Sequence, residues 1–247
     1  MARILVPLPE QDVDPTEVGV PCRMLAEAGH TLVFATPQGR VASADVRMLT
    51  GKGLGPWTWV LRADARGREA WAVTAALPSF AQPITYDAIA DTGFDAMHLP
   101  GGHAKGMRVY LESEAVQRAV VATMAADKPL GAICHGVLVA ARARSEGRSV
   151  LHGRRTTALT ERLELLAWRL TRLWLGDYYR TYPETVQSEV TRALADPSQF
   201  ELGPRSTKRD DPDHLERGFV VRDGRYVSAR WPGDAHAYGR ALLELLA

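Results

Sequence analysis

The sequence predicts an α/β protein with a mostly parallel central sheet, because strand-like and helix-like segments alternate along much of its length. Residues 3–36 have the pattern of a strand, a helix and a second strand. Residues 94–144 repeat this alternation, and residues 219–246 have the pattern of paired strands followed by a closing helix. Strands joined through a helix lie parallel in one sheet, so the first two segments together predict a parallel core.

The first strand is expected over Arg3–Leu8 and the second over Thr31–Thr36, where short apolar runs occur. The helix between them is expected over Thr16–Ala28. Asp14 can cap its first turn, a proline follows at the first helical position and a glycine ends it. Its apolar residues recur at helical spacing.

Residues 40–83 are less regular. The glycine-rich run at 51–56 is expected to be a loop, and it lacks the residue order of a phosphate-binding P-loop. Trp57, Trp59 and Trp71 are expected to pack this segment against the rest of the protein.

The second half of the chain gives clearer periodicity. The expected strands are Phe94–Leu99, Leu130–Ile133, Thr156–Leu159 and Phe219–Ser228, the last with a hairpin turn at Asp223-Gly224. The expected helices are Glu112–Ala126, Val137–Arg144 and Asp234–Leu246.

A long insert separates the last strands from the rest of the sheet. We expect residues 1–161 and 217–247 to form the α/β core and residues 162–216 to form an inserted helical and loop cap. Apolar residues at helical spacing predict a helix over Leu163–Tyr179, and the polar stretch Asp196–Asp213 is typical of a surface loop.

Composition limits the classes of function. The 247 residues are 46% hydrophobic with a net charge of +1, so neither nucleic acid nor an anionic membrane is an expected partner. Two cysteines without Cys-x-x-Cys spacing predict neither a disulfide framework nor a structural metal site. With no signal-peptide pattern and no apolar run of about 20 residues, a cytoplasmic location is expected.

Cys134 is the most informative residue, because it stands between an expected buried strand and an expected helix. Unpaired backbone N–H groups and the helix dipole favour negative charge at that junction, where a cysteine can become a thiolate nucleophile. Cys134 could instead be a small core residue, as many free cysteines are.

Other reactive groups are expected at the same edge of the sheet. Gly101 and Gly102 follow one strand, His135 follows Cys134, and Glu17 follows the first strand. Ligands of open parallel sheets bind at the carboxyl ends of the strands. His135 could exchange protons with substrate or thiol, and the backbone N–H groups of Gly101, Gly102 and His135 could stabilise an oxyanion.

These residues belong to motifs that resemble the ThiJ/PfpI superfamily, which is related to class I glutamine amidotransferases. The motifs are Pro100-Gly101-Gly102-His103, Ala132-Ile133-Cys134-His135-Gly136, Glu17-Val18-Gly19-Val20-Pro21 and the ending Ser228 to Ala235. The resemblance is strongest to the larger branch of heat-shock chaperones and glyoxalases III. It implies a flavodoxin-like three-layer sandwich and often a homodimer.

The resemblance also implies two acidic site residues. Glu17 would hydrogen-bond the cysteine, and Glu161 would orient His135. Either could have a simpler role, Glu17 as an acidic residue favoured in the first turn of a helix and Glu161 as a solvated residue that opens the next helix.

The function that the resemblance implies first is a glyoxalase III-like conversion of 2-oxoaldehydes to 2-hydroxy acids, without cofactor or metal. Two alternatives remain. One is a peptidase or amidase using Cys134, His135 and Glu161, with a small amide or peptide as substrate. The other is a holding chaperone or redox sensor with an apolar surface formed by aromatic residues of the insert (Trp168, Trp174, Tyr178, Tyr179). A glutaminase is not favoured, because no distal His-x-Glu pair follows the last strand.

Overall fold

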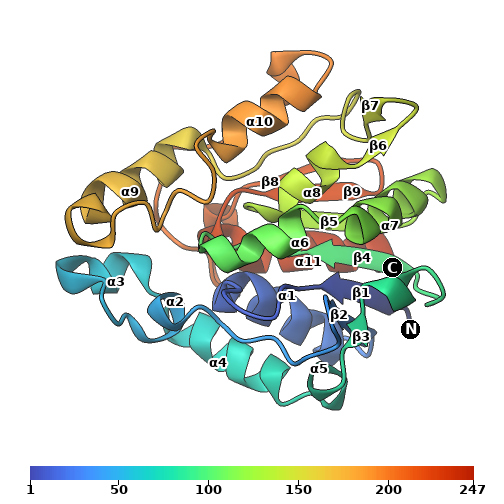
Figure 1. Ribbon diagram of the computed structural model, residues 1–247, viewed down its shortest axis with the longest axis horizontal. Coiled ribbons are helices and arrows are strands. Elements are labelled where there is room, and N and C mark those ends of the chain that lie inside the picture. Colours follow the sequence, from blue (N-terminus) through green and yellow to red (C-terminus); the bar gives the residue numbers. More distant parts are fainter.

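The computed structural model describes all residues 1–247, and a seven-stranded sheet runs through its centre (Figure 1). The strand order is β3-β2-β1-β4-β5-β9-β8, and every neighbouring pair is parallel except β8 with β9. This confirms the predicted α/β fold with a mostly parallel sheet. The strands are β1 Arg3–Pro7, β2 Thr31–Thr36, β3 Ile84–Thr85, β4 Ala96–Leu99, β5 Leu130–Ile133, β8 Val220–Asp223 and β9 Tyr226–Ala229.

Helices cover both faces of this sheet and complete a three-layer sandwich of the flavodoxin type. One layer contains α1 Pro15–Glu27, α4 Ala65–Ala75, α5 Pro78–Ala81 and α11 Ala235–Leu246. The opposite layer contains α6 Arg108–Leu111, α7 Glu114–Ala125 and α8 Gly136–Arg142. The apolar core fills the space between the sheet and these layers, as the buried strands require.

Helix α1 begins where the sequence predicts. The Asp14 side chain accepts hydrogen bonds from the backbone N–H groups of Thr16 and Glu17 at 2.8 and 3.0 Å. Such a cap satisfies donors that have no partner within the helix. Gly19 lets α1 approach α4, because a Cβ at this position would lie 2.5 Å from the backbone nitrogen of Trp71.

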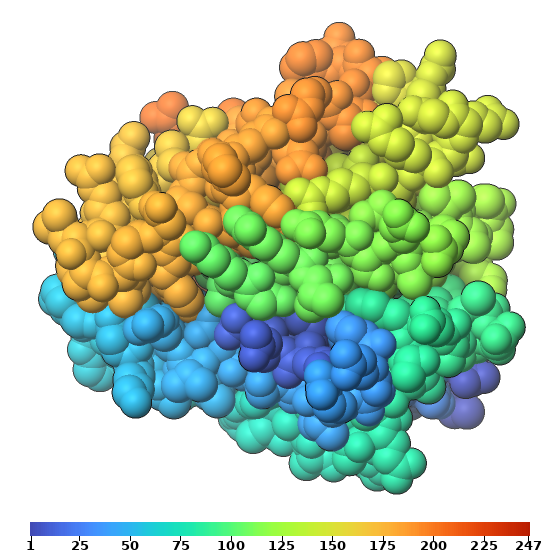
Figure 2. Space-filling model, in the orientation of Figure 1, coloured from blue at the N-terminus to red at the C-terminus, as the bar shows by residue number.

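The insert forms two helices, α9 Glu161–Leu175 and α10 Val186–Ala193. In Figure 2 the residues of α9 meet those near 50–60 and those near 105–112 at the surface. The indole Nε1–H of Trp174 donates to the carbonyl of Gly53 at 2.9 Å, and the Tyr178 hydroxyl donates to the Asp45 carboxylate. The glycine-rich loop therefore contacts the insert, next to the short helices α2 Val46–Thr50 and α3 Thr58–Leu61.

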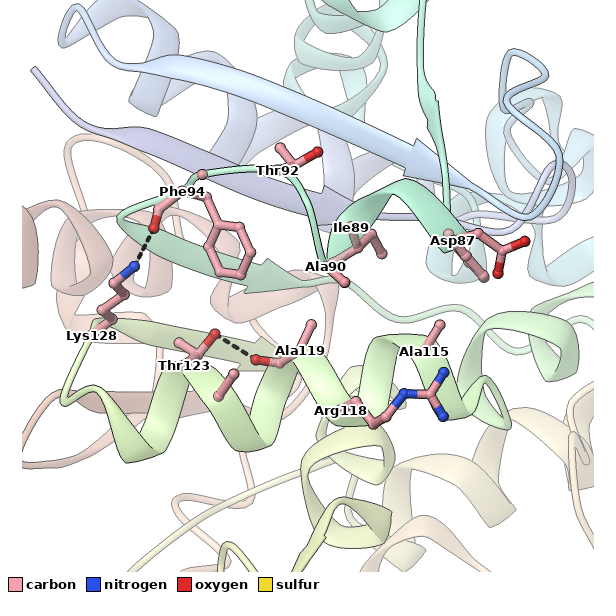
Figure 3. A pocket seen from close by; sticks show the side chains of 13 residues that line it. Asp87, Ile89, Ala90, Thr92, Phe94, Ala115, Arg118, Ala119, Thr123 and Lys128 are labelled. Atoms are coloured by element: carbon pink, nitrogen blue, oxygen red, sulfur yellow. Dashed lines mark hydrogen bonds between the residues drawn. The ribbon is translucent and has the colours of Figure 1, made fainter.

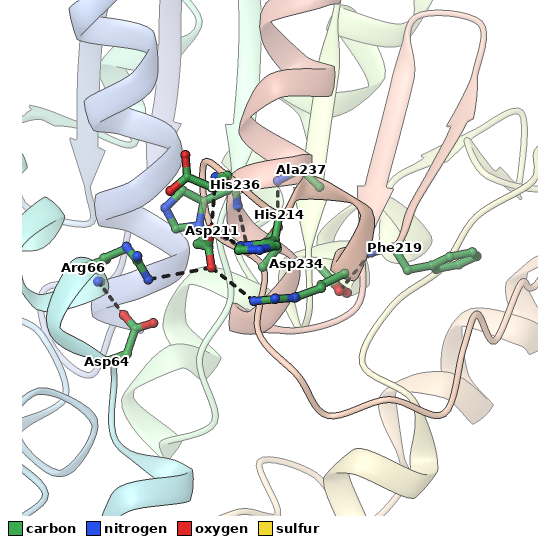
Figure 4. A network of polar contacts seen from close by, with 12 residues as sticks. Asp64, Arg66, Asp211, His214, Phe219, Asp234, His236 and Ala237 are labelled. Atoms are coloured by element: carbon green, nitrogen blue, oxygen red, sulfur yellow. Dashed lines mark hydrogen bonds and ion pairs between the residues drawn. The ribbon is translucent and has the colours of Figure 1, made fainter.

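Polar contacts hold the C-terminal end of the insert, near Asp210 and Asp211, against the core (Figure 4). The Asp211 carboxylate pairs with His214, Arg217 and Arg66. The neighbouring Asp210 accepts from the imidazole of His236 at 3.2 Å, at the start of α11. These contacts use His214 and His236, the late histidines of the chain, in structural pairs.

Two local predictions are wrong, and one helix was not predicted. Thr156–Leu159 is not a strand, because only an isolated bridge joins Thr156 to Phe200 and its neighbours bond to side chains of the last strands instead. Residues 65–75 form the regular helix α4, although that region lacks clear periodicity. Trp59 is 87% exposed and does not pack the segment down, whereas Trp71 is buried.

The helix after the cysteine ends at Arg142, two residues earlier than predicted, because a small hairpin follows. Its strands are β6 Arg144–Ser145 and β7 Arg148–Ser149. No helix of the chain is both long enough and apolar enough to cross a membrane.

Candidate functional site

Cys134 occupies a sharp turn between β5 and α8, as the sequence predicts. Its φ of 58° lies in the left-handed region, which residues other than glycine seldom adopt. The side chain is fully buried, and the backbone N–H donates to the carbonyl of Ala229 at 3.0 Å, which ties the turn to the neighbouring strand. A strained backbone of this kind costs about 1–3 kcal/mol and is characteristic of functional sites.

His135 places an unprotonated ring nitrogen next to the Cys134 thiol. Its Nδ1 lies 3.5 Å from Cys134 Sγ and its Nε2 lies 3.0 Å from Thr181 Oγ1. The Thr181 hydroxyl donates its single proton to the carbonyl of His103 at 2.5 Å, so it must accept from Nε2–H. Burial, followed by the charges of His103 and Arg142, lowers the pKa of His135 well below its ordinary value, which keeps the ring neutral. The proton therefore sits on Nε2, and Nδ1 can accept one from the thiol.

Glu17 lies on the other side of the cysteine, in the first turn of α1. The carboxyl is fully buried, and its Oε2 accepts from the Gly101 N–H at 2.9 Å. Burial, followed by the charge of Asp14, raises the pKa of this carboxyl well above its ordinary value, so it retains a proton at neutral pH. The Cys134 thiol partly offsets the rise, although Glu17 Oε1 has no hydrogen-bond partner with ordinary geometry.

The sulfur of Cys134 is held as a thiol in this closed site. Burial raises its pKa well above the ordinary value, and the nearby carboxyls of Glu17 and Asp14 add to the rise. The backbone N–H of His135 acts in the opposite direction by donating to the sulfur. Desolvation thus opposes formation of the thiolate that the helix terminus alone would favour. Helix α8 has only seven residues, so its dipole is short. Ionisation here needs a base, which the Nδ1 of His135 can supply.

Gly101 lies beside the cysteine, Gly102 follows it next to Asp12 and Met107, and the two amides differ in their hydrogen bonds. A Cβ at Gly101 would lie 2.7 Å from the His135 nitrogen and 3.0 Å from Cys134 Cβ, so only glycine fits this contact. The Gly101 N–H already donates to Glu17, whereas the Gly102 N–H makes no hydrogen bond within the chain. Of these two amides, Gly102 is the one with its donor unused.

The structure does not bring Glu161 to His135. Glu161 is the first residue of α9 and its side chain is exposed to solvent. Its backbone N–H donates to the side chain of Gln187 at 2.9 Å. Thr181 takes the position at Nε2 that the resemblance assigned to Glu161. Thr181 lies in the insert, where no periodicity or motif marks it. His103, by contrast, stands in the glycine motif after β4 and stacks edge-on against His135 with ring centroids 5.4 Å apart.

A small cavity of about 100 Å³ lies next to these histidines, between the core and the insert. It is lined mainly by apolar residues of α3 and α9, together with His103, Tyr179 and Asp14. Burial raises the pKa of Asp14 to about 6, and its bonds to the start of α1 oppose the rise.

Larger hollows lie elsewhere. A groove of about 490 Å³ runs between α7 and the segment Asp87–Phe94, where the Lys128 ammonium donates to the Phe94 carbonyl at 2.6 Å (Figure 3). None of the predicted site residues lines it. The smaller cavity is connected to the site through His103, which lines it and contacts His135, although none of the predicted site residues lines this cavity itself. The chain contains no cluster of three or more His, Cys, Asp or Glu side chains that could hold a metal ion.

Comparisons with known proteins agree with this fold. A family model described as ThiJ/PfpI family-like matches residues 8–204. Deglycase TK1284 of Thermococcus kodakarensis is 29% identical over 166 residues, which are 66% of this chain and 69% of the relative. Deglycase PfpI of Pyrococcus furiosus is 28% identical over the same shares of the two chains.

Solved structures share the fold at lower identity. Rapid Encystment Protein 24 kDa of Francisella tularensis superimposes with a TM-score of 0.69 at 16% identity, covering 100% of both chains. Glyoxalase III of Candida albicans gives a TM-score of 0.67 at 14% identity, covering 98% of this chain and 96% of that one.

Proposed function

We propose that this chain, which belongs to the ThiJ/PfpI family, is a cysteine enzyme that converts small 2-oxoaldehydes to 2-hydroxy acids without a cofactor. One observation supports this most: a neutral imidazole nitrogen faces the thiol on one side while a protonated carboxyl lies on the other. Two proton-exchanging groups around one nucleophile suit a reaction that moves a proton between adjacent carbons.

The reaction begins when His135 Nδ1 takes the proton of the Cys134 thiol. The sulfur then forms a bond to the aldehyde carbon, and the carbonyl oxygen becomes the oxygen of a hemithioacetal. The unused N–H of Gly102 is suited to stabilise negative charge on that oxygen. Desolvation around the sulfur strengthens each of these interactions.

Proton transfer completes the conversion. His135 first returns the thiol proton to the hemithioacetal oxygen and then, neutral again, removes the proton from the former aldehyde carbon, while the ketone oxygen takes the proton of Glu17 to give an enediol. His135 then donates its proton to the former ketone carbon, and the first hydroxyl returns a proton to Glu17. The first carbon is thereby oxidised to a thioester and the second is reduced to an alcohol, so no external oxidant is consumed. Water then breaks the carbon–sulfur bond, which releases the 2-hydroxy acid and restores the thiol.

Burial of the site favours small substrates over the alternatives. Cys134 and His135 are both fully buried, and the adjoining cavity holds only about 100 Å³, which disfavours a peptide chain. Tyr179 is 1% exposed and Tyr178 bonds to Asp45, so the aromatic surface expected for a chaperone is not formed by these two residues.

The test is lactate formation from methylglyoxal by the purified protein. We expect Cys134→Ala to abolish it, and Cys22→Ala to leave it intact because Cys22 is buried in the core away from the site. Near wild-type activity in Cys134→Ala would overturn the proposal. Hydrolysis of aminopeptidase-type substrates that depends on Cys134, without lactate formation, would establish the hydrolase instead.

A further inference from the structure

The cavity beside His103 contains polar atoms that have no partner. Four buried side-chain nitrogens and oxygens without hydrogen bonds belong to residues that line it, namely His103 Nδ1, Tyr179 Oη, Arg209 Nη1 and Trp231 Nε1. Buried polar groups in folded proteins are nearly always paired, so each such atom needs an explanation. Four around one cavity of about 100 Å³ indicate that a ligand supplies the missing partners.

The chemistry of these atoms indicates the kind of ligand. A guanidinium and an indole N–H can only donate, and a phenol O–H can donate as well. Arg209, Trp231 and Tyr179 therefore present donors to the cavity, so the group that satisfies them must be an acceptor.

Charge distinguishes a carboxylate from a neutral acceptor. Arg209 is the single cationic residue lining the cavity, and its guanidinium stacks on Trp231 at 5.3 Å and donates only to the Arg62 carbonyl at 3.3 Å. It forms no ion pair. The nearby Arg230, by contrast, donates to the Asp234 carboxylate at 2.9 and 2.8 Å. A partly buried cation without an anion is costly, and a bound carboxylate would remove that cost.

Asp14 is the single acidic residue that lines the cavity, and its contacts leave Arg209 free to bind a ligand carboxylate. Its Oδ1 is engaged by the amides of Thr16 and Glu17 at the start of α1. The backbone dipoles there offset its charge. The charge of the Arg209 guanidinium opposes the rise in the pKa of Asp14, but the two groups form no hydrogen bond or ion pair, so the N–H donors of Arg209 remain available.

We infer that this cavity binds the carboxylate of an acidic 2-oxoaldehyde, with Arg209, Trp231 and Tyr179 as its donors. The inference rests on the proposed function for the identity of the reacting end, because the His103 ring that lines the cavity also contacts His135. The aldehyde carbon would bond to Cys134 Sγ as described above, and the carboxylate would remain unchanged through the reaction. Arg209 is then a specificity-determining residue contributed by the insert.

The first experiment measures binding without turnover. Calorimetric titration of the Cys134→Ala protein with butanoate and with butanamide compares a carboxylate with a neutral group of the same shape. We expect butanoate to bind at least 10-fold more tightly, and Arg209→Met to remove that preference, since one charge-assisted bond is worth roughly 10- to 100-fold. Equal binding of acid and amide, no binding of butanoate, or a preference that survives Arg209→Met would overturn the inference.

Matched variants separate the specific effect from a general one. Arg205→Met removes the same charge from the same loop at an exposed position outside the cavity, and we expect it to keep the preference. If Arg209→Met does not fold, Trp231→Phe serves instead, since it removes the indole N–H donor and keeps an aromatic side chain. It should reduce butanoate affinity severalfold and change butanamide affinity less. Loss of preference in Arg205→Met equal to that in Arg209→Met would also overturn the inference.

The second experiment distinguishes failure of the inference from failure of the proposed function. It compares kcat/KM for 4,5-dioxopentanoate, a 2-oxoaldehyde with a carboxylate, with kcat/KM for methylglyoxal. We expect the ratio to favour the acid and to fall at least 10-fold in Arg209→Met. Turnover of methylglyoxal with no preference for the acid refutes the inference alone. Binding of butanoate at Arg209 without turnover of either aldehyde supports the carboxylate site and refutes the proposed function.

Discussion

Glu164 gives the sharpest test of how the insert is held together. This carboxyl is 2% exposed on α9, and its Oε2 accepts from the Val186 N–H at 3.0 Å, at the start of α10. Its Oε1 lies 3.7 Å from the guanidinium of Arg180. Burial raises its pKa from 4.5 to about 7, although the bond to Val186 and the charge of Arg180 oppose the rise.

The sign of the resulting pH dependence follows directly. The folded protein keeps the Glu164 proton between pH 4.5 and about 7, while the unfolded chain releases it. The free energy of unfolding contributed by this group is therefore fully present below pH 4.5 and is lost as the pH rises to about 7. The loss amounts to about 3 kcal/mol, at about 1.4 kcal/mol for each pH unit.

Glu164→Gln removes the titration but keeps an acceptor for the Val186 N–H. Urea unfolding at several pH values should show that the variant gains about 3 kcal/mol over the wild type between pH 4.5 and pH 8. Glu216→Gln is the control, since that carboxyl is exposed and forms no ion pair, and it should change stability by about 0.5 kcal/mol or less at every pH. Glu161→Gln is unsuitable because the charge of Glu161 contributes to the raised pKa of Glu164. A difference between wild type and Glu164→Gln that stays constant with pH would refute the reasoning.

Two further predictions concern the site. Thr181→Val should lower kcat/KM about 10- to 100-fold and shift the pH–rate profile, because His135 loses the acceptor that keeps its proton on Nε2, whereas Thr181→Ser should restore both. Unchanged profiles in the valine variant would mean that Thr181 does not position the ring. Gly101→Ala would place a Cβ 2.6 Å from Glu17 Oε2, so it should abolish activity and cost about 1–3 kcal/mol of stability. Gly153→Ala, where a Cβ meets nothing within 4 Å, should change neither, and a Gly101→Ala enzyme as active and stable as that control would contradict the predicted clash.

The sheet was predictable because its information is local. A buried strand such as β5 or β2 is a short apolar run, and α1 has a cap, a proline and a helical period within a few residues. Helix α4 lacks such a signal, since it packs mainly against another helix through the close approach at Gly19 and not through a wide apolar stripe. The strand predicted at Thr156–Leu159 does not form, because the Thr156 hydroxyl and the Thr157 N–H bond to the Ser228 side chain of a strand distant in sequence.

The proposed nucleophile and its nearest partners were predictable for the same reason. Cys134 and His135 follow the strand β5, and Glu17 lies in the first turn of the helix that follows β1, so parallel topology brings all three to the same edge of the sheet. Glu161 was inferred from a resemblance that extends poorly into the insert, and the structure places Thr181 there instead. No local pattern could have identified Thr181, which lies 46 residues from its partner and acts only through the folded chain.

The insert therefore does more than cover the site. It supplies Thr181, which determines the nitrogen of His135 that holds the proton, and Arg209, which presents an unpaired charge to the cavity. The thiol is too deeply desolvated to ionise without that base, so the reactivity of the core residue Cys134 depends on a side chain of the insert. The core, which local sequence patterns predict, and the insert, which lacks such patterns, thus both shape the surroundings of the Cys134 sulfur. Under the proposed function, changes in the insert should alter both which substrates are accepted and how readily the Cys134 thiolate forms.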